Sequence, residues 1–293
     1  MHKDCFTCDK KQVEKLSQIL KLSNNQELVL KAMVEDYLSK CDMTKTNPEV
    51  MGEIWSMLMK KLNMDNPYGE IKEYYNKLVM DMIPELRKMI KESDNPLDTA
   101  LKLSITGNLI DFGAKHEFNG EILRDMLMKI DTTVLAIDDS LEMLEKIKNA
   151  RTLLYLGDNC GEIVLDKLFI EEIKKANKDI LVYYGVRGKS IVNDVTLEDA
   201  EKVSMKETAG VISNGDGSMG TVLNKTSPEF RQIFNEADMV IAKGQGNYES
   251  LFGEERDNMF FMFMAKCQLM AEPLSVDTMR IVCLKNRKMV VKK

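Results

Sequence analysis

The sequence predicts an α/β protein, with a Rossmann-like three-layer α/β/α domain and a mostly parallel sheet, joined to an all-helical N-terminal domain. Two observations support this. Residues 1–150 carry apolar residues at helical spacing only, whereas from residue 151 short apolar runs alternate with helical patterns. Short buried strands that alternate with helices indicate a parallel sheet covered on both faces. We therefore expect two domains, 1–150 and 151–293.

Asn-Pro dipeptides at 47–48, 66–67 and 95–96 punctuate the helical part. Asn is a favoured N-cap and Pro suits the first helical turn, so a helix is expected after each dipeptide. The stretch PEVMGEIWSMLMKKL, for example, places Ile54 and Leu58 on one face. The same spacing predicts further helices over 10–21, 25–40, 97–111, 119–130 and 139–149.

Compact apolar runs predict the strands of the second part, over 152–156, 180–186, 210–213 and 238–242. Helices are expected between and after them, over 161–176, 196–202, 228–236 and from 247–252 onward. The tail MRIVCLKNRKMVVKK predicts a final strand pair that turns near residues 285–287.

The composition excludes several classes of protein. Hydrophobic residues make up 44% and charged residues 30% of the 293 positions, which is typical of a globular chain. The net charge of −6 argues against a nucleic-acid-binding surface, and no apolar stretch is long enough to span a membrane. The N-terminus lacks a signal-peptide pattern, and the six cysteines are too sparse for a disulfide framework. We expect a cytoplasmic protein that binds neither nucleic acid nor membrane.

Polar residues follow each predicted strand, where ligands of open α/β sheets bind. The candidate site residues there are Asp158, Asn159, Glu162, Arg187, Asp194, Lys243 and Asn247. Carboxylates and amides suit a hard divalent cation such as Mg²⁺ or Mn²⁺. Lysine and the backbone N–H groups of glycine-rich loops suit a phosphate. Together they predict metal-assisted phosphoryl chemistry.

Each feature also has a purely structural interpretation. Asp158 or Asn159 would cap the next helix, and Thr196 with Asp199 fits a capping box. The glycine-rich segment after the third strand and the Lys-Gly-Gln-Gly-Asn segment after the fourth would be tight turns. The functional interpretation gains weight because all of these segments lie at predicted strand ends.

Sharper catalytic motifs are absent. GVRGKS ends like a P-loop, but Tyr183 stands where that motif needs glycine, and no G-x-G-x-x-G follows a strand. An aspartyl-nucleophile phosphatase would need an acid where Cys160 stands. The two histidines are the terminal His2 and the isolated His116, so histidine catalysis is not expected.

The pair Cys5-x-x-Cys8 is half of a zinc site, which His2 and Cys41 would complete. A redox pair is expected beside a βαβ unit, whereas this pair precedes helices. An inert or structural role, a metal site and a redox role all remain open for Cys5 and Cys8 at this point.

The motifs together resemble one known family. GDNCGEIVLDKLFIEEI (157–173) resembles the DNAGE-hydrophobic-DK signature of the damage-control phosphatase family, formerly domain of unknown function 89. Later blocks agree in order and spacing: VRGKSIVNDVTLEDA, VISNGDGSMGT, SPEFRQIFNEADMVIAKGQGNYESL and FMAKC. The CxxC pair and GNLIDFG (107–113) resemble its prokaryotic stand-alone branch. Cys160 departs from the usual Ala, and the tail after Cys267 is less similar.

This resemblance implies a helical domain packed on a Rossmann-like domain. It also implies a divalent metal (Mg, Mn, Co or Ni) held by Asp158, Asn159 and Asp194. Lys243 would bind the substrate phosphate, with Asn247 nearby. Members hydrolyse phosphate monoesters, often sugar phosphates or damaged phosphometabolites, and one eukaryotic branch has been proposed to methylate protein carboxyls.

We therefore expect a metal-dependent phosphatase whose partner is a small phosphorylated metabolite. A metal-shell water or Asp158 itself would attack phosphorus, and Glu162 would position that water. Arg187 would join the substrate-binding groups, and Asn108 and Asp111 would close the site from the helical domain.

Two alternatives come from other functional classes. An S-adenosylmethionine-dependent carboxyl methyltransferase would need a glycine-rich loop after the first strand and an acid ending the second. Here the first loop is acidic and the second strand ends in Arg187. The other alternative is a non-catalytic protein that binds a phosphometabolite, which the sequence does not exclude.

Overall fold

The computed structural model describes residues 1–107, 120–130 and 133–287, within which one sheet has seven strands. They are β1 (Ile137–Asp138), β2 (Thr152–Leu156), β3 (Leu181–Val186), β4 (Gly210–Ser213), β5 (Met239–Lys243), β6 (Met259–Ala265) and β7 (Arg280–Lys285). Their order across the sheet is β1-β7-β6-β5-β2-β3-β4. Neighbours are parallel except β6 and β7. The predicted mostly parallel sheet is confirmed.

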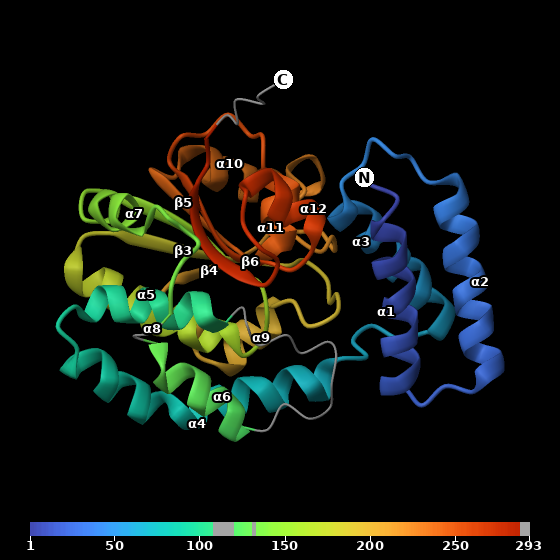
Figure 1. Ribbon diagram of the computed structural model, residues 1–293, viewed down its shortest axis with the longest axis horizontal. Helices are drawn as coiled ribbons and strands as arrows, with labels where there is room; N and C mark the ends of the chain where they lie inside the picture. The colour runs from blue at the N-terminus through green and yellow to red at the C-terminus, as the bar shows by residue number, and fades with distance from the viewer. Residues whose placement is uncertain (108–119, 131–132, 288–293) are drawn as a thin grey trace.

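Helices cover both faces of the sheet (Figure 1). They are α4 (Gly69–Glu92), α5 (Pro96–Gly107), α6 (Gly120–Met128), α7 (Ser140–Ile147), α8 (Glu162–Ala176), α9 (Leu197–Lys202), α10 (Pro228–Glu236), α11 (Gly244–Leu251) and α12 (Gln268–Ala271). Helices α4–α9 share a core with Leu153 and Tyr155 of β2, and α10–α12 share one with Leu154 and Leu156. Successive strand side chains point to opposite faces, so β2 is buried on both.

Helices α1 (Cys5–Ile19), α2 (Asn24–Lys40) and α3 (Asn47–Leu62) form a third cluster beside the sheet (Figure 1). Leu16, Val34 and Trp55 lie in its core, and Ile191 from the loop after β3 joins them. The Trp55 indole donates a hydrogen bond to the Ser190 carbonyl at 3.1 Å. Helix α3 is therefore held against a strand-end loop.

The first half of the chain thus contributes to two different cores. Helices α1–α3 have their own cluster, whereas α4–α7 share the core of the sheet. This half also contains β1, which pairs with β7, so the expectation that it is entirely helical was wrong. The domain boundary at residue 150 stays a prediction. None of the helices in the described part of the chain is both long and apolar enough to cross a membrane.

The Asn-Pro dipeptides precede helices as predicted, but most of the asparagines do not cap them. Thr46, not Asn47, caps α3 through its side chain. Helix α4 starts after Tyr68, which makes no side-chain cap. Asn95 does accept a hydrogen bond from the first turn of α5, at 3.3 Å. A preceding threonine with the same hydrogen-bonding capacity explains the difference at α3.

The strand prediction was incomplete near the C-terminus. Strand β6 was missed, because a continuous apolar run has no alternation to separate strand from buried helix. Strand β7 was expected, and within the described residues it pairs with β6 and β1. The second strand of the expected pair was placed after residue 287. Those residues, 288–293, lie outside the described part of the chain.

Candidate active site at the carboxyl ends of the strands

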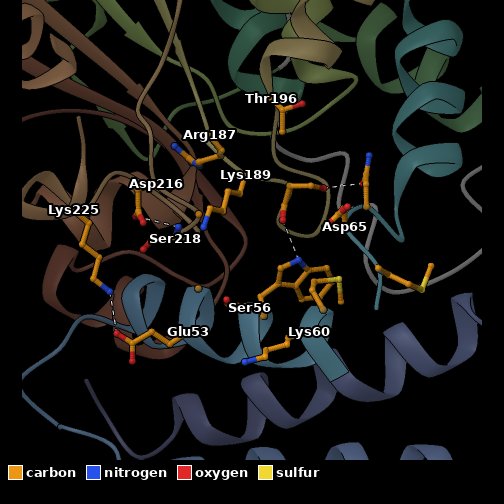
Figure 2. Close-up of a pocket in the computed structure, with 18 of the residues that line it drawn as sticks. Glu53, Ser56, Lys60, Asp65, Arg187, Lys189, Thr196, Asp216, Ser218 and Lys225 are labelled. Atoms are coloured by element: carbon orange, nitrogen blue, oxygen red, sulfur yellow. Dashed lines mark hydrogen bonds and ion pairs between the residues drawn. The ribbon is translucent and has the colours of Figure 1, made fainter. Parts of the chain in front are cut away.

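A cavity of about 1050 Å³ opens between α3 and the loops that follow β3 and β4 (Figure 2). Trp55, Ser56 and Lys60 line it from α3, while Lys189 and Asp216 line it from the loops. A cavity of this size has room for a small metabolite. It therefore marks the carboxyl edge of the sheet as a candidate binding region.

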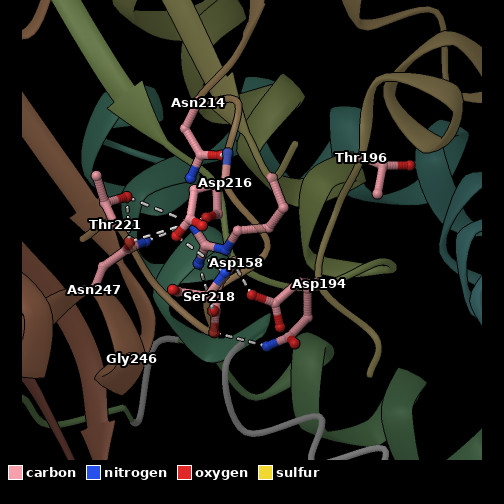
Figure 3. Close-up of polar contacts among 12 residues, drawn as sticks. Asp158, Asp194, Thr196, Asn214, Asp216, Ser218, Thr221, Gly246 and Asn247 are labelled. Carbon is pink, nitrogen blue, oxygen red and sulfur yellow. Dashed lines mark hydrogen bonds and ion pairs between the residues drawn. The ribbon is translucent and has the colours of Figure 1, made fainter. Parts of the chain in front are cut away.

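The loops after β2 and β3 run side by side at the same edge of the sheet. The Val195 N–H donates to the Asp158 carbonyl at 2.9 Å, and Asn159 stands opposite Asp194 in a short antiparallel bridge. These backbone contacts bring two predicted acidic residues, Asp158 and Asp194, into one cluster (Figure 3).

Asn159 links the carboxylates of this cluster. Its Nδ2 donates to Oδ2 of Asp158 and to Oε1 of Glu162, each at 2.7 Å. Because both carboxylates require a donor, the nitrogen must face them and the amide oxygen must point away. That oxygen accepts no hydrogen bond from the described residues. Asn159 thus presents an oxygen suited to a cation.

Arg187 supplies the positive charge that balances the acids. Its Nε donates to Oδ2 of Asp194 at 2.7 Å, and its Nη2 lies 3.7 Å from Oδ1 of Asp158. Its Nη1 donates to Asn247 at 3.2 Å. Arg187 is only 2% exposed, and its Nη2 is buried without a hydrogen-bond partner. A buried, unmatched donor beside two carboxylates is a position that a substrate oxygen fits.

Burial raises the pKa of the acids in this cluster and so favours their neutral form. Burial, with the charge of Asp194, raises the pKa of Asp158 to about 6, against the opposing effect of Arg187. Burial also raises the pKa of Glu162 to about 7, and Lys243 opposes that shift. The pKa of Asp194 is raised by burial as well. A divalent cation would stabilise the charged form of these carboxyl groups, which burial disfavours.

Gly244 lets Asp158 approach the start of α11. Its φ is +80°, and a Cβ at this position would lie 2.0 Å from Oδ2 of Asp158. Only glycine combines this backbone conformation with such a close approach. The segment after β5 is therefore both the tight connection that the structural interpretation expected and part of the acidic cluster.

Lys243 and Asn247, predicted to bind phosphate, are both fully buried. The Lys243 amine donates to the Ser104 carbonyl at 2.9 Å, to Asp166 at 2.8 Å and to Glu162 at 3.2 Å. The amide nitrogen of Asn247 donates to two backbone carbonyls, at 2.8 and 3.2 Å. Contact of either residue with a phosphate stays a prediction.

The predicted metal ligands fit a small divalent cation by their chemistry. Two carboxylates and one amide oxygen are hard ligands of the kind that Mg²⁺ and similar ions prefer. Among the residues that the structure describes, no three His, Cys, Asp or Glu side chains are grouped to hold a metal. The fit therefore depends on the amide of Asn159. Neither Asp158 nor Asn159 caps α8, whose N-cap is Gly161 without a side-chain bond.

Helix α4 contributes two buried groups that the sequence patterns did not single out. Oδ1 of Asn76 accepts from the Gly161 N–H at 2.6 Å, which holds the turn before α8. Nζ of Lys72 lies 2.5 Å from Oδ2 of Asp199, which also forms the expected capping box with Thr196. A single Lys or Asn in an amphipathic helix carries no sequence signal, so only the fold identifies them.

The predictions also named two other groups, Asn108 with Asp111 and Cys5 with Cys8. Asn108 and Asp111 lie outside the described residues. Cys5 and Cys8 are free thiols of α1, and burial raises the pKa of both, that of Cys5 to about 11. No metal-binding trio of His, Cys, Asp or Glu that includes them is formed in the described part of the chain. Their three alternative roles therefore stay open.

Comparisons with known proteins agree with this architecture. A family model described as the damage-control phosphatase ARMT1-like domain matches residues 1–282. An uncharacterized protein of Methanocaldococcus jannaschii is 38% identical over 247 residues, which cover 81% of this chain and 80% of that protein. A damage-control phosphatase of Pyrococcus horikoshii is 32% identical over 287 residues, 97% of each chain. One of Archaeoglobus fulgidus is 31% identical over 250 residues, 85% of this chain and 84% of that protein.

The backbone is also similar to a solved structure. A crystal structure of a DUF89 family protein from Pyrococcus horikoshii matches with a TM-score of 0.89 and 31% sequence identity. The match covers 98% of this chain and 99% of that chain. The similarity therefore extends over the helical part and the sheet alike, and the expected fold class is confirmed.

Proposed function

Because this chain belongs to the damage-control phosphatase ARMT1-like domain family, we propose that it is a metal-dependent phosphatase of small metabolites. Its substrates would be phosphate monoesters, such as sugar phosphates or damaged phosphometabolites. The observation that supports this most is the buried cluster of Asp158, Asn159 and Asp194 beside an unmatched donor of Arg187.

Asp158, Asn159 and Asp194 would hold the divalent metal, for which Mg²⁺, Mn²⁺, Co²⁺ and Ni²⁺ are the candidates. When bound there, the metal supplies Lewis-acid stabilisation of the phosphoryl oxygens. The protein's own part is to hold the three ligands in place before substrate arrives. Charges that are already in place stabilise the transition state without reorganisation during the reaction.

Arg187 and Glu162 take the remaining roles near the reacting phosphate. The free Nη2 of Arg187 donates to a phosphoryl oxygen, while its Nε keeps Asp194 in position. Glu162, with its pKa raised to about 7, accepts a proton from the attacking water. Direct attack by the Asp158 carboxylate is the alternative, and trapping a phosphorylated aspartate would identify it.

Lys243 would contribute positive charge from behind the cluster. Its amine already has three acceptors, so a phosphate would have to replace one of them to be bound directly. The leaving group would occupy the cavity between α3 and the strand-end loops, where Lys189 and Lys60 lie. Helix α3, which lines this cavity, would then help to select the metabolite.

A phosphatase screen of the purified protein tests the proposal, with sugar phosphates and with each of the four metals in turn. We expect turnover that EDTA abolishes and that Asp194→Ala reduces at least 100-fold. Asp98→Ala, which removes only one partner of a surface i,i+4 pair, is the matched control and should keep full activity. Activity that persists in EDTA would contradict the metal assignment.

The same screen separates the alternative functions. A protein that only binds phosphometabolites would show calorimetric heats with sugar phosphates but no release of inorganic phosphate. A methyltransferase would bind S-adenosylmethionine, and we expect no such binding, because the loop after β2 is acidic rather than glycine-rich.

A further inference from the structure

Asp166 is a fully buried carboxylate that the proposed chemistry does not use. Its Oδ1 accepts from Ser104 Oγ, from the Tyr155 hydroxyl and from Lys243, each at 2.8 Å. Its Oδ2 accepts from the Tyr184 hydroxyl at 2.9 Å. A buried charge is tolerated only when it is paired and hydrogen-bonded, and Asp166 has both kinds of partner.

The donors around Asp166 are themselves fixed. Burial, with the charge of Asp166, raises the pKa of both Tyr155 and Tyr184 well above the usual value, so both hydroxyls keep their protons. The two rings are stacked, with centroids 5.6 Å apart. Ser104 is on α5, the tyrosines are on β2 and β3, and Asp166 is on α8. Four elements therefore hold this carboxylate in one place.

Lys243 extends this network toward the acidic cluster. An ammonium group has three donors, and those of Lys243 are matched by Ser104, Asp166 and Glu162. Because Asp166 holds the amine from one side, the amine can hold Oε2 of Glu162 from the other. The other carboxylate oxygen of Glu162, Oε1, accepts a hydrogen bond from Nδ2 of Asn159.

We infer that Asp166 is a positioning residue, which orients the amide of Asn159 toward the metal through Lys243 and Glu162. The inference rests on the proposed function, since it concerns the same metal ligands. Partners that touch a ligand directly, as Glu162 touches Asn159, fix ligand orientation and contribute to metal affinity. Asp166 acts on this partner through Lys243. The opposing hypothesis is that Asp166 only stabilises the core of the sheet.

Binding of Co²⁺ alone, followed by visible absorbance in a titration of the metal-free protein, separates the two. We expect Asp166→Asn to weaken Co²⁺ binding about 10-fold, the lower end of the range for groups that touch a ligand directly, and to change the absorption spectrum, because the ligand geometry changes. Leu168→Ala is the matched control on the same helix: it opens the core and removes no polar group. It should lower stability to urea and leave both affinity and spectrum unchanged.

A double-mutant cycle tests the route through Glu162. In the background of Glu162→Ala, Asp166→Asn should have no further effect on Co²⁺ affinity, because the link to Asn159 is already removed. Additive losses, or an equal loss of affinity in Leu168→Ala, would overturn the inference. If the unmodified protein binds none of the four candidate metals, the proposed function fails and the inference fails with it. If it binds Co²⁺ and Asp166→Asn binds it equally well, only the inference fails.

Discussion

Nε of Arg187 lies 2.7 Å from Oδ2 of Asp194, and the two side chains are only 2% and 4% exposed. The residues are seven positions apart, on either side of a loop that turns back on itself after β3. The same guanidinium also faces Asp158, so Arg187 neutralises charge on two carboxylates of the candidate site.

Replacing Arg187 by Met should lower the free energy of unfolding by about 3 to 5 kcal/mol, because it leaves buried carboxylates without their counter-charge. Arg87→Met is the control. It removes the exposed pair of Arg87 with Glu171, and we expect a loss of less than about 1 kcal/mol. Urea unfolding of both variants measures the difference. Equal losses would contradict the assignment of Arg187 as the buried counter-charge.

Gly244→Ala should abolish the proposed metal binding, because the new Cβ would lie 2.0 Å from Oδ2 of Asp158 and displace that carboxylate. Gly253→Ala is the matched control: its φ is +105°, and nothing lies within 4 Å of the added atom. Both variants should lose on the order of 1 kcal/mol or more of stability from the left-handed backbone. Calorimetry with Mn²⁺ should show a binding defect in Gly244→Ala alone.

Asp9 should make the stability of the protein depend on pH. The residue is 1% exposed, its Oδ2 has no hydrogen-bond partner, and burial with the charge of Glu249 raises its pKa from 3.8 to about 7. A carboxyl group whose pKa is raised on folding contributes to the stability of the folded protein. This contribution is complete below the unfolded pKa and is lost as pH rises through the folded pKa.

Asp9→Asn removes this dependence. The variant should be more stable than the unmodified protein, and the difference between their unfolding free energies should increase by about 3 kcal/mol between pH 5 and pH 8. Asp4→Asn, whose side chain is 75% exposed, is the control and should show no such growth. Denaturant melts at both pH values measure the effect, and a constant difference between the proteins would refute the buried charge.

Cys5 should react slowly with iodoacetamide at pH 7.5. Burial raises its pKa to about 11, so the reactive thiolate is on the order of 100-fold scarcer than for an ordinary thiol. Peptide mapping of the alkylated protein gives its rate, with a free cysteine peptide as the reference. Reaction faster than the reference would favour the redox role, and stoichiometric zinc lost in a Cys5→Ser, Cys8→Ser protein would favour the metal site.

The sequence by itself determined most of the fold and predicted where the candidate site lies. Strands β2 to β5 and the helices between them were predicted from apolar periodicity, because that pattern depends only on which faces of a local segment are buried. Asp158, Asn159 and Asp194 were placed at one edge of the sheet, because the carboxyl ends of parallel strands meet there.

Only the tertiary structure decided which side chains meet. The pairing of β7 with β6, the buried Lys72 and Asn76 of α4, and the four donors around Asp166 join segments that lie far apart in the chain. No local pattern encodes such contacts, since each residue is ordinary in its own helix or strand. Asp158 and Asn159 could be chosen from their segment alone, whereas the network that orients Asn159 exists only where α5, α8, β2, β3 and β5 pack together.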